Sequence, residues 1–229
     1  MIAPKDIEYL QGKAQGIADE IAARMDAKRE ADGPRPHPDH NYASEIGHPC
    51  RRYLYYARRN WRDRKMIGID LSYRLDEGNE REAQIERELS DIGFRLIRSQ
   101  EKIWIDDAKI SGKIDGMIDM GKKRFKLRKP FADVREIPVE IKSIAPQFWE
   151  STATLDDIRR HRKFWIRRIP NQLNLYLHAT KIALGFLILT TWARRPRILP
   201  MILDEDMLDH DLAKARDVNA YCERGETPP

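Results

Sequence analysis

Residues 111–120 read SGKIDGMIDM, and residues 138–143 read PVEIKS. Each stretch has the apolar pattern of a short strand, yet each carries a carboxylate in its middle, Asp115 in the first and Glu140 in the second. An acidic side chain lowers β propensity, and its burial is costly unless it is paired or bound to a metal. Lys142 follows shortly after Glu140. We therefore expect the two strands to bring Asp115, Glu140 and Lys142 into one site at the edge of a sheet.

Alternation along a strand decides which side chains can meet. In 138–143 it places Glu140 and Lys142 on one face, opposite Val139 and Ile141. In 109–120 it places Asp115 on a face with Lys109, Ser111, Lys113, Met117 and Asp119, opposite Ile110, Gly112, Ile114, Gly116 and Ile118.

Two neighbouring carboxylates repel each other, and one keeps its proton unless a cation lies between them. Mg²⁺ or Mn²⁺ suits such a pair, because hard cations take oxygen ligands and retain several waters. Lys142 would then orient or deprotonate a water, or stabilise the charge that develops on a phosphate. The small residues Ser111, Gly112 and Gly116 are expected to let a nucleic-acid backbone approach closely. The pattern thus predicts metal-dependent cleavage of nucleic acid.

The rest of the sequence alternates between helical and strand patterns. Gly93 suits the end of a helix, Asp204 suits the start of one, and Pro200 marks an edge strand. The order of elements predicts an α/β fold with a mixed sheet flanked by helices. The predicted helices are 6–30, 50–61, 71–92, 152–165, 171–180 and 205–224, and the predicted strands are 94–105, 109–120, 123–128, 134–143, 182–193 and 197–203.

Residues 31–41, ADGPRPHPDHN, hold three prolines and a glycine, a composition typical of a linker. We therefore divide the chain into an N-terminal helical arm with its linker, 1–43, and a folded domain, 44–229. The N-terminus lacks the pattern of a secretory signal, and the apolar stretch 182–193 is too short to span a bilayer. A cytoplasmic protein that binds no membrane is expected.

The composition narrows the class of protein only slightly. The 229 residues suffice for one sizeable core, and 42 Lys+Arg against 37 Asp+Glu give a formal charge of +5, too mild an excess to indicate nucleic-acid binding by itself. Cys50 and Cys222 form no Cys-x-x-Cys pair, which excludes a zinc ribbon. Cys50 is expected to be a small buried residue.

Basic residues gather in clusters. CRRYLYYARRNW at 50–61 and IRRHRKFWIRR at 158–168 interleave basic with aromatic side chains, and ARRPR at 193–197 adds three arginines. Such surfaces track phosphates while their rings stack on bases, and a solvated helix face is the alternative. The predicted nucleic-acid-binding residues are Arg51, Arg52, Arg58, Arg59, Arg160, Arg162, Lys163, Arg167 and Arg168.

These motifs resemble the PD-(D/E)XK nuclease superfamily, with KIDG supplying the aspartate and EIK the E-x-K element. The similarity is greater to the RecB-type branch, which includes phage-type exonucleases. GNERE at 78–82 matches a helix pattern of that branch and QLNLY at 172–176 matches its Q-x-x-x-Y helix. SEIGHPCRRYLYY at 44–56 is similar to its amino-terminal segment, so the resemblance covers about 44–203.

The resemblance implies a restriction-endonuclease-like core and a Mg²⁺- or Mn²⁺-dependent DNase with exonuclease-like action in DNA recombination, repair or phage replication. It implies that Glu82 and the backbone carbonyl of Ile141 join Asp115 and Glu140 as metal ligands. Lys142 assists the attacking water. Gln172 and Tyr176, one turn apart on a helix, contact phosphate or orient the lysine.

The resemblance also bears on cofactors and partners. Many members of the branch hold an iron–sulfur cluster on four cysteines, and two cysteines cannot complete that shell, so no cluster is expected in this chain. DNA is the expected partner of a bacterial or phage-encoded protein. A second copy of the chain or a recombination protein is a further candidate, with the 1–30 helix as the candidate surface.

Plainer interpretations stay open for each residue. Asp115 precedes a glycine and suits a turn, Glu140 and Lys142 suit the solvated face of an edge strand, and Glu82 lies among other glutamates. Gln172 and Tyr176 suit a half-buried helix. For function, the alternatives are a nucleic-acid-binding module of the same fold that has lost cleavage, and an RNA-processing nuclease.

Overall fold

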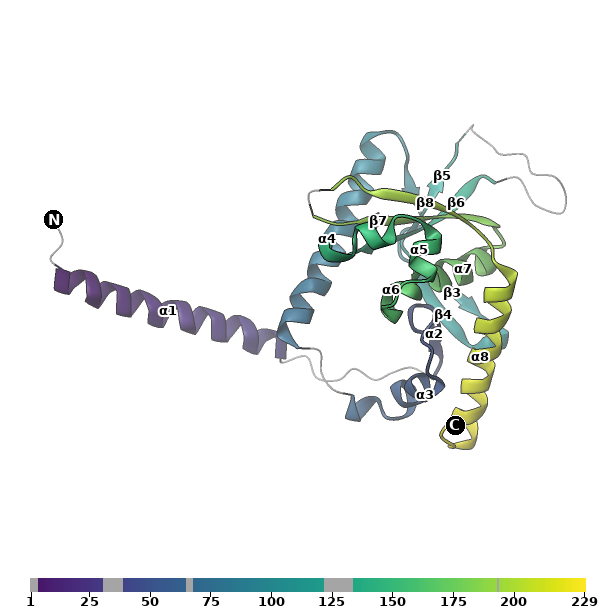
Figure 1. Cartoon of the computed structure of the whole chain (residues 1–229), viewed down its shortest axis with the longest axis horizontal. Coiled ribbons are helices and arrows are strands. Elements are labelled where there is room, and N and C mark those ends of the chain that lie inside the picture. The colour runs from purple at the N-terminus through teal and green to yellow at the C-terminus, as the bar shows by residue number, and fades with distance from the viewer. Residues whose placement is uncertain (1–3, 31–38, 65–67, 122–133, 193) are drawn as a thin grey trace.

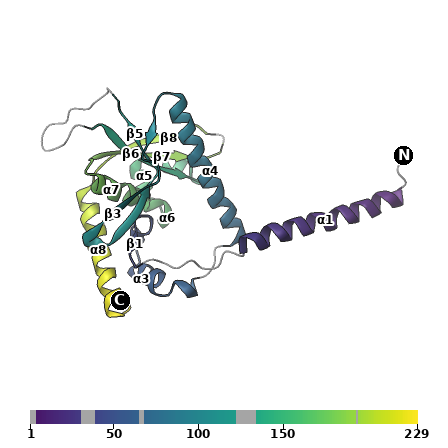
Figure 2. The same cartoon turned by 180° about the vertical axis from the view of Figure 1, so that it is seen from behind.

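The computed structural model describes residues 4–30, 39–64, 68–121, 134–192 and 194–229. Two adjoining sheets carry helices on both sides, and helix α1 (Pro4–Glu30) extends away from this body (Figures 1 and 2). This is the α/β restriction-endonuclease-like architecture, with a mixed sheet flanked by helices, that the sequence predicts. No helix in the described ranges has both the length and the apolar character to cross a bilayer.

The larger sheet has the strand order β2-β5-β6-β7-β8. β6 and β7 run parallel, whereas the other neighbours pair antiparallel. β6 and β7 lie inside the sheet, and β7 (LGFLILT) is apolar on both faces, as a buried parallel strand requires. β8, which contains Pro200, is the predicted edge strand. The strands are β2 (Leu96–Ile97), β5 (Gly116–Asp119), β6 (Glu136–Ser143), β7 (Leu184–Thr190) and β8 (Arg197–Ile202).

A smaller sheet has the order β1-β4-β3, with β1 (Asn41–Tyr42), β4 (Ile110–Ile114) and β3 (Glu101–Ile105). Asn41 is buried, and its side-chain amide donates to the carbonyl of Ala108 at 3.1 Å. The folded body therefore includes Asn41 and Tyr42, which lie before the boundary expected at residue 44.

Helices cover both faces of the larger sheet. On one face, Ile85 and Leu89 of α4 pack with the side chains of Ile137, Val139 and Ile141. On the other, α7 packs its leucines against those of β7. Besides α1, the α-helices of the described residues are α2 (Ala43–Ile46), α3 (Arg51–Arg59), α4 (Ile69–Asp91), α5 (Leu155–Arg159), α6 (Phe164–Arg167), α7 (Ile169–Thr180) and α8 (Glu205–Arg224).

Two predicted strands are broken in the structure. The predicted strand 94–105 divides into β2 and β3, and 109–120 divides at Asp115 into β4 and β5, which belong to different sheets. Between the pairs Ile97↔Met117 and Glu101↔Ile114, the three residues 98–100 lie opposite the two residues 115–116. This is a β-bulge, and it bends the hairpin at Asp115.

The predicted helix 152–165 was also wrong as one element. Thr154 starts α5 with a capping box, in which its hydroxyl accepts from the Asp157 N–H and the Asp157 carboxylate accepts in return. α5 ends at Arg159, and α6 begins only at Phe164. The predicted strand 123–128 lies outside the described residues.

Candidate active site

Asp115 occupies the bend between β4 and β5. Its Oδ2 accepts a hydrogen bond of 2.7 Å from the backbone N–H of Ile141, and the side chain of Gln100 donates to the same carboxylate. Gln100 belongs to the bulge and has a φ of 58°. The side chain of Asp115 is 10% exposed. The bulge thus fixes this carboxylate beside the centre of β6.

Glu140 lies in the middle of β6 and is fully buried. Its carboxylate forms an ion pair with the ammonium of Lys142, the next side chain on the same face of the strand. Within the described part of the chain, neither carboxylate oxygen has a hydrogen-bond partner of good geometry. A buried charge with so few partners is unfavourable unless a cation completes its surroundings.

The ammonium of Lys142 lies where the predicted ligands converge. Its Nζ donates to the carbonyl oxygen of Ile141 at 3.1 Å. It lies 3.9 Å from Asp115 Oδ2 and 3.9 Å from Glu82 Oε1 of helix α4. With the ion pair to Glu140, the four predicted ligand groups therefore surround a single cationic nitrogen.

Burial and mutual repulsion shift the pKa of every carboxyl group in this cluster upward. Burial raises the pKa of Glu140 to about 8. Burial, aided by the charge of Asp115, raises the pKa of Glu82 to about 7. Burial also raises the pKa of Asp115. Burial alone would lower the pKa of Lys142, but the carboxylates, Glu140 foremost, raise it above its ordinary value.

These shifts predict that the metal-free protein loses stability as the pH rises from about 5 to about 8. The folded-state pKa values of Glu82 and Glu140 lie above the ordinary 4.5, so the folded state binds more protons than the unfolded state in this window. The stability that Glu82 and Glu140 contribute is complete below pH 4.5. It is lost as the pH rises through their folded-state pKa values of about 7 and about 8. We expect the Tm in EDTA to fall by at least about 5 °C. Glu140→Gln should flatten this decline, and an unchanged decline would contradict the assignment.

Gln172 and Tyr176 lie together on α7, and both are buried. The amide of Gln172 donates to the phenol oxygen of Tyr176 at 2.8 Å. Burial, with the charge of Glu140, raises the pKa of Tyr176 above its ordinary value, so its hydroxyl stays protonated. Tyr176 is only 1% exposed. The Tyr176 hydroxyl is thus covered by the protein in this structure, and the role that the resemblance implies for the pair, contact with phosphate or orientation of the lysine, stays a prediction.

The glycines of this region serve packing, which corrects the expectation that they admit a nucleic-acid backbone. A Cβ on Gly112 would lie 2.7 Å from Cε1 of Tyr176, and one on Gly116 would lie 2.4 Å from Cδ2 of Leu96. Both positions are filled by the protein itself.

Gly112→Val should therefore destabilise the protein by about 1–3 kcal/mol, because the side chain collides with a buried ring. The measurement is the urea midpoint. Gly78→Ala is the matched control: a Cβ on this helical glycine meets nothing within 4 Å, so the substitution should stabilise by roughly 0.5–1 kcal/mol. Equal effects of the two variants would contradict the packing described here.

The donor set fits a hard divalent cation. Three carboxylates and a carbonyl supply oxygens alone, as Mg²⁺ and Mn²⁺ prefer, and both oxygens of Glu140 lack hydrogen-bond donors of good geometry among the described residues. In the arrangement that the structure describes, no three His, Cys, Asp or Glu side chains close around a common metal position. In this arrangement the Lys142 ammonium, rather than a metal ion, neutralises the carboxylates.

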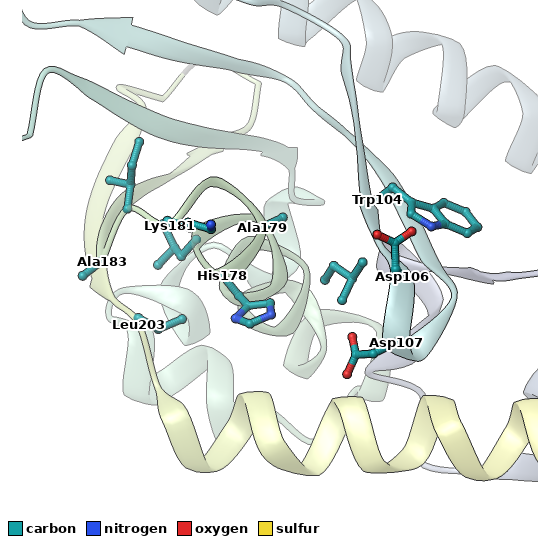
Figure 3. Close-up of a pocket in the computed structure, with 11 residues that line it drawn as sticks. Trp104, Asp106, Asp107, His178, Ala179, Lys181, Ala183 and Leu203 are labelled. Atoms are coloured by element: carbon teal, nitrogen blue, oxygen red, sulfur yellow. The ribbon is translucent and has the colours of Figure 1, made fainter. Parts of the chain in front are cut away.

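A cleft of about 390 Å³ opens onto this cluster and includes Glu82, Asp115 and Ile141 in its lining. A larger hollow of about 490 Å³ shares no lining residue with it. In that hollow, Asp106 and Asp107 lie across from His178 of α7 (Figure 3). The smaller cleft is the relevant one, because of the two only it is lined by converging groups, namely Glu82, Asp115 and Ile141.

The structure joins two predicted basic segments into one aromatic surface. His48 stacks on Tyr53 of α3 with ring centroids 4.1 Å apart and meets Phe164 of α6 edge-on at 4.8 Å. Phe164 in turn contacts Trp165, and Lys163 lies 5.1 Å from the Trp165 ring centroid. Of the basic residues expected here, those exposed on the surface are Arg51, Arg52, Arg59, Arg160, Arg162 and Arg167, and Lys163 and Arg168 are half-buried.

Arg58 does not belong to that surface. It is 6% exposed, and its guanidinium donates to Asn219 and to Asp39, both at 2.6 Å. Arg58 therefore anchors α3 to α8 and is not placed to meet a phosphate. Two other expectations change: Arg51 pairs with Asp217 at 3.3 Å, and Cys50 is exposed where a buried residue was expected.

Sequence reasoning missed Gln100, which hydrogen-bonds Asp115. Its left-handed backbone follows from the bulge, and no glycine marks the turn. The other acid of this region, Asp119, accepts from the N–H of Gly121 at 2.8 Å, in the turn role that Asx residues favour.

Comparison with known proteins gives a structural likeness without a sequence match. No family model matches the chain, and no curated protein does. An alkaline exonuclease from Laribacter hongkongensis superposes with a TM-score of 0.55 at 14% identity, covering 82% of this chain and 89% of that one. Its complex with dAMP gives 0.54 at 12% identity with the same coverage. SSO0001 gives 0.49 at 17% identity, covering 89% of this chain and 86% of that one. The chain shares the fold of the exonuclease.

Proposed function

We propose that this protein is a Mg²⁺- or Mn²⁺-dependent deoxyribonuclease that hydrolyses phosphodiester bonds, with exonuclease-like action. One observation carries the proposal: the oxygens of Glu82, Asp115, Glu140 and Ile141 surround Lys142 Nζ within 4 Å. An ammonium group inside a cation-binding set of oxygens suits hydrolysis of a charged phosphate diester.

In this proposal each residue has a separate task. Glu82, Asp115, Glu140 and the Ile141 carbonyl would hold the divalent ion, which, when bound, polarises the phosphate and eases deprotonation of water. Lys142 would orient the attacking water and stabilise charge on the phosphate. Gln100 and the Ile141 N–H keep Asp115 in position, and the hydrogen-bonded Gln172–Tyr176 pair supports the site from behind.

DNA as substrate and action at ends draw support from the shared fold. One structural neighbour is an alkaline exonuclease, and one of its crystal structures contains dAMP. The exposed basic and aromatic residues of α3 and α6 suit contact with phosphates and bases. Recombination, repair or phage replication, with a second copy or a recombination protein as partner, is the proposed setting.

The test is an assay of linear, circular and single-stranded DNA and of RNA in Mg²⁺, Mn²⁺ or EDTA. We expect linear DNA to be degraded in either metal and to survive in EDTA. Binding without loss of any substrate would favour the inactive module, and loss of RNA alone would favour an RNA-processing enzyme. Asp119→Asn is the matched control for Asp115→Asn, because an asparagine at position 119 keeps the turn and Asp119 lies outside the acidic cluster.

A further inference from the structure

We propose that Trp192, backed by Arg81, is a stacking platform for a nucleobase of the substrate at the mouth of the candidate active site. This inference rests on the proposed function, because it names how the same site receives its nucleic acid. Trp192 lies outside the motifs and the basic clusters, and Arg81 lies within GNERE, where only Glu82 was assigned a role.

Trp192 is 58% exposed, an open position for so large an apolar residue. The guanidinium carbon of Arg81 lies 3.8 Å from its ring centroid, which is stacking distance. One face of the indole is therefore covered by a cation, and the exposure leaves the ring surface available to a second planar group. A nucleobase is such a group, and tryptophan is a common stacking partner for bases.

Arg81 keeps unused hydrogen-bond capacity. Its Nη1 donates to Gln84 Oε1 at 2.7 Å, and among the described residues it forms no ion pair with a carboxylate. Many other arginines of this chain are paired with acids, as Arg98 is with Glu136 and Arg159 with Asp204. An unneutralised guanidinium next in sequence to Glu82 suits a phosphate beside the stacked base.

The fold places this platform beside the acidic cluster. In the parallel pair β6–β7, Lys142 lies opposite Leu189 and Ser143 opposite Thr190, so Trp192 follows the end of β7 nearest Lys142. Three residues at strand rise span about 10 Å, a distance of a few nucleotides at most. Arg81 also lies near the cluster in sequence, because it directly precedes Glu82 on α4. The Oε1 atom of Glu82 is 3.9 Å from Lys142 Nζ.

The platform is also held firmly. Thr190 and Thr191, immediately before Trp192, are each 3% exposed. The Arg81 side chain is held by its hydrogen bond to Gln84. An aromatic ring presented from buried backbone loses little freedom when a base stacks on it, which favours binding.

The test measures binding of a short single-stranded DNA by fluorescence anisotropy in EDTA, where cleavage is absent. Trp192→Ala should weaken binding about 5- to 150-fold, the range found for removing one base–aromatic stack. Trp192→Phe should keep most of the affinity. Trp104→Ala is the matched control, since Trp104 is 48% exposed and lines the other hollow, and it should bind like the wild type.

An abasic scan then locates the stacked base. Removing the base at one position near the scissile phosphate should weaken wild-type binding and leave Trp192→Ala unaffected, because the partner is already gone. If DNA is cleaved but the Trp192 and Trp104 variants bind alike, the platform is wrong and the nuclease stands. If the protein cuts no nucleic acid but Trp192→Ala still lowers its affinity for DNA, base stacking on Trp192 is supported and the proposed nuclease activity is contradicted. If the protein binds no DNA at all, both fail.

Discussion

Lys142→Ala should lower the cleavage rate by about 10²–10³-fold at saturating metal, the effect expected for losing a charged group that acts on the reacting phosphate. The same change should leave metal affinity unimpaired or increase it. In the structure the ammonium contacts Glu140 and the Ile141 carbonyl, so it would compete with a divalent ion that binds the same oxygens. The two measurements are kcat on linear DNA and Mn²⁺ binding by calorimetry.

This opposite movement of rate and affinity distinguishes a catalytic ammonium from a structural one. Lys113→Ala is the matched control, because Lys113 lies exposed on β4 and outside the acidic cluster. It should leave both quantities near wild type. Cleavage by Lys142→Ala within tenfold of wild type, or weaker Mn²⁺ binding, would contradict the role assigned to this lysine.

Asp115→Asn and Glu140→Gln should each abolish metal-dependent cleavage and weaken Mn²⁺ binding by more than about 100-fold, since each removes a charged ligand that the neighbouring groups hold in place. The backbone N–H of Ile141 holds the Asp115 side chain in place. An asparagine at this position therefore keeps the shape of the carboxylate and loses its charge. Raising the Mn²⁺ concentration should increase the Tm of the wild type and leave that of either variant unchanged.

Circular dichroism of both variants in EDTA checks that they remain folded. Asp119→Asn again serves as the control and should respond to Mn²⁺ like the wild type. A variant at position 115 or 140 that still gains stability from Mn²⁺ would show that the metal binds elsewhere.

The sequence predicts the elements whose patterns are long and local. The helices α4, α7 and α8 and the buried strand β7 follow from apolar periodicity and from end signals. Asp204 caps α8 by accepting from the N–H of Met207 at 3.0 Å, and Gly93 takes the positive φ of 85° that ends α4.

The breaks at 98–100 and at 115 could not be predicted, because they depend on strand pairing. A bulge is defined by two strands together, and here its residues with positive φ are Arg98 and Gln100, which carry no glycine signal. The break alters the predicted faces: Met117, expected on the polar face with Asp115, is fully buried.

The convergence of the candidate ligands could be predicted from the sequence, whereas their roles stay a prediction. An acidic residue within an apolar strand pattern is costly to bury, so Asp115 and Glu140 stand out. The resemblance added Glu82, which the structure brings within 4 Å of Lys142 Nζ. The burial of Arg58 and the neighbours of Gly112 were not predictable, because they depend on where α8 and Tyr176 pack.

The most direct test of the account is the anomalous scattering of Mn²⁺ in a crystal of the wild-type protein. We predict one strong peak bounded by Glu82, Asp115, Glu140 and the Ile141 carbonyl, at about 2.0–2.2 Å from its oxygen ligands, with the Lys142 ammonium displaced from Glu140. A peak at another position, or an ammonium still paired with Glu140 at saturating Mn²⁺, would contradict it.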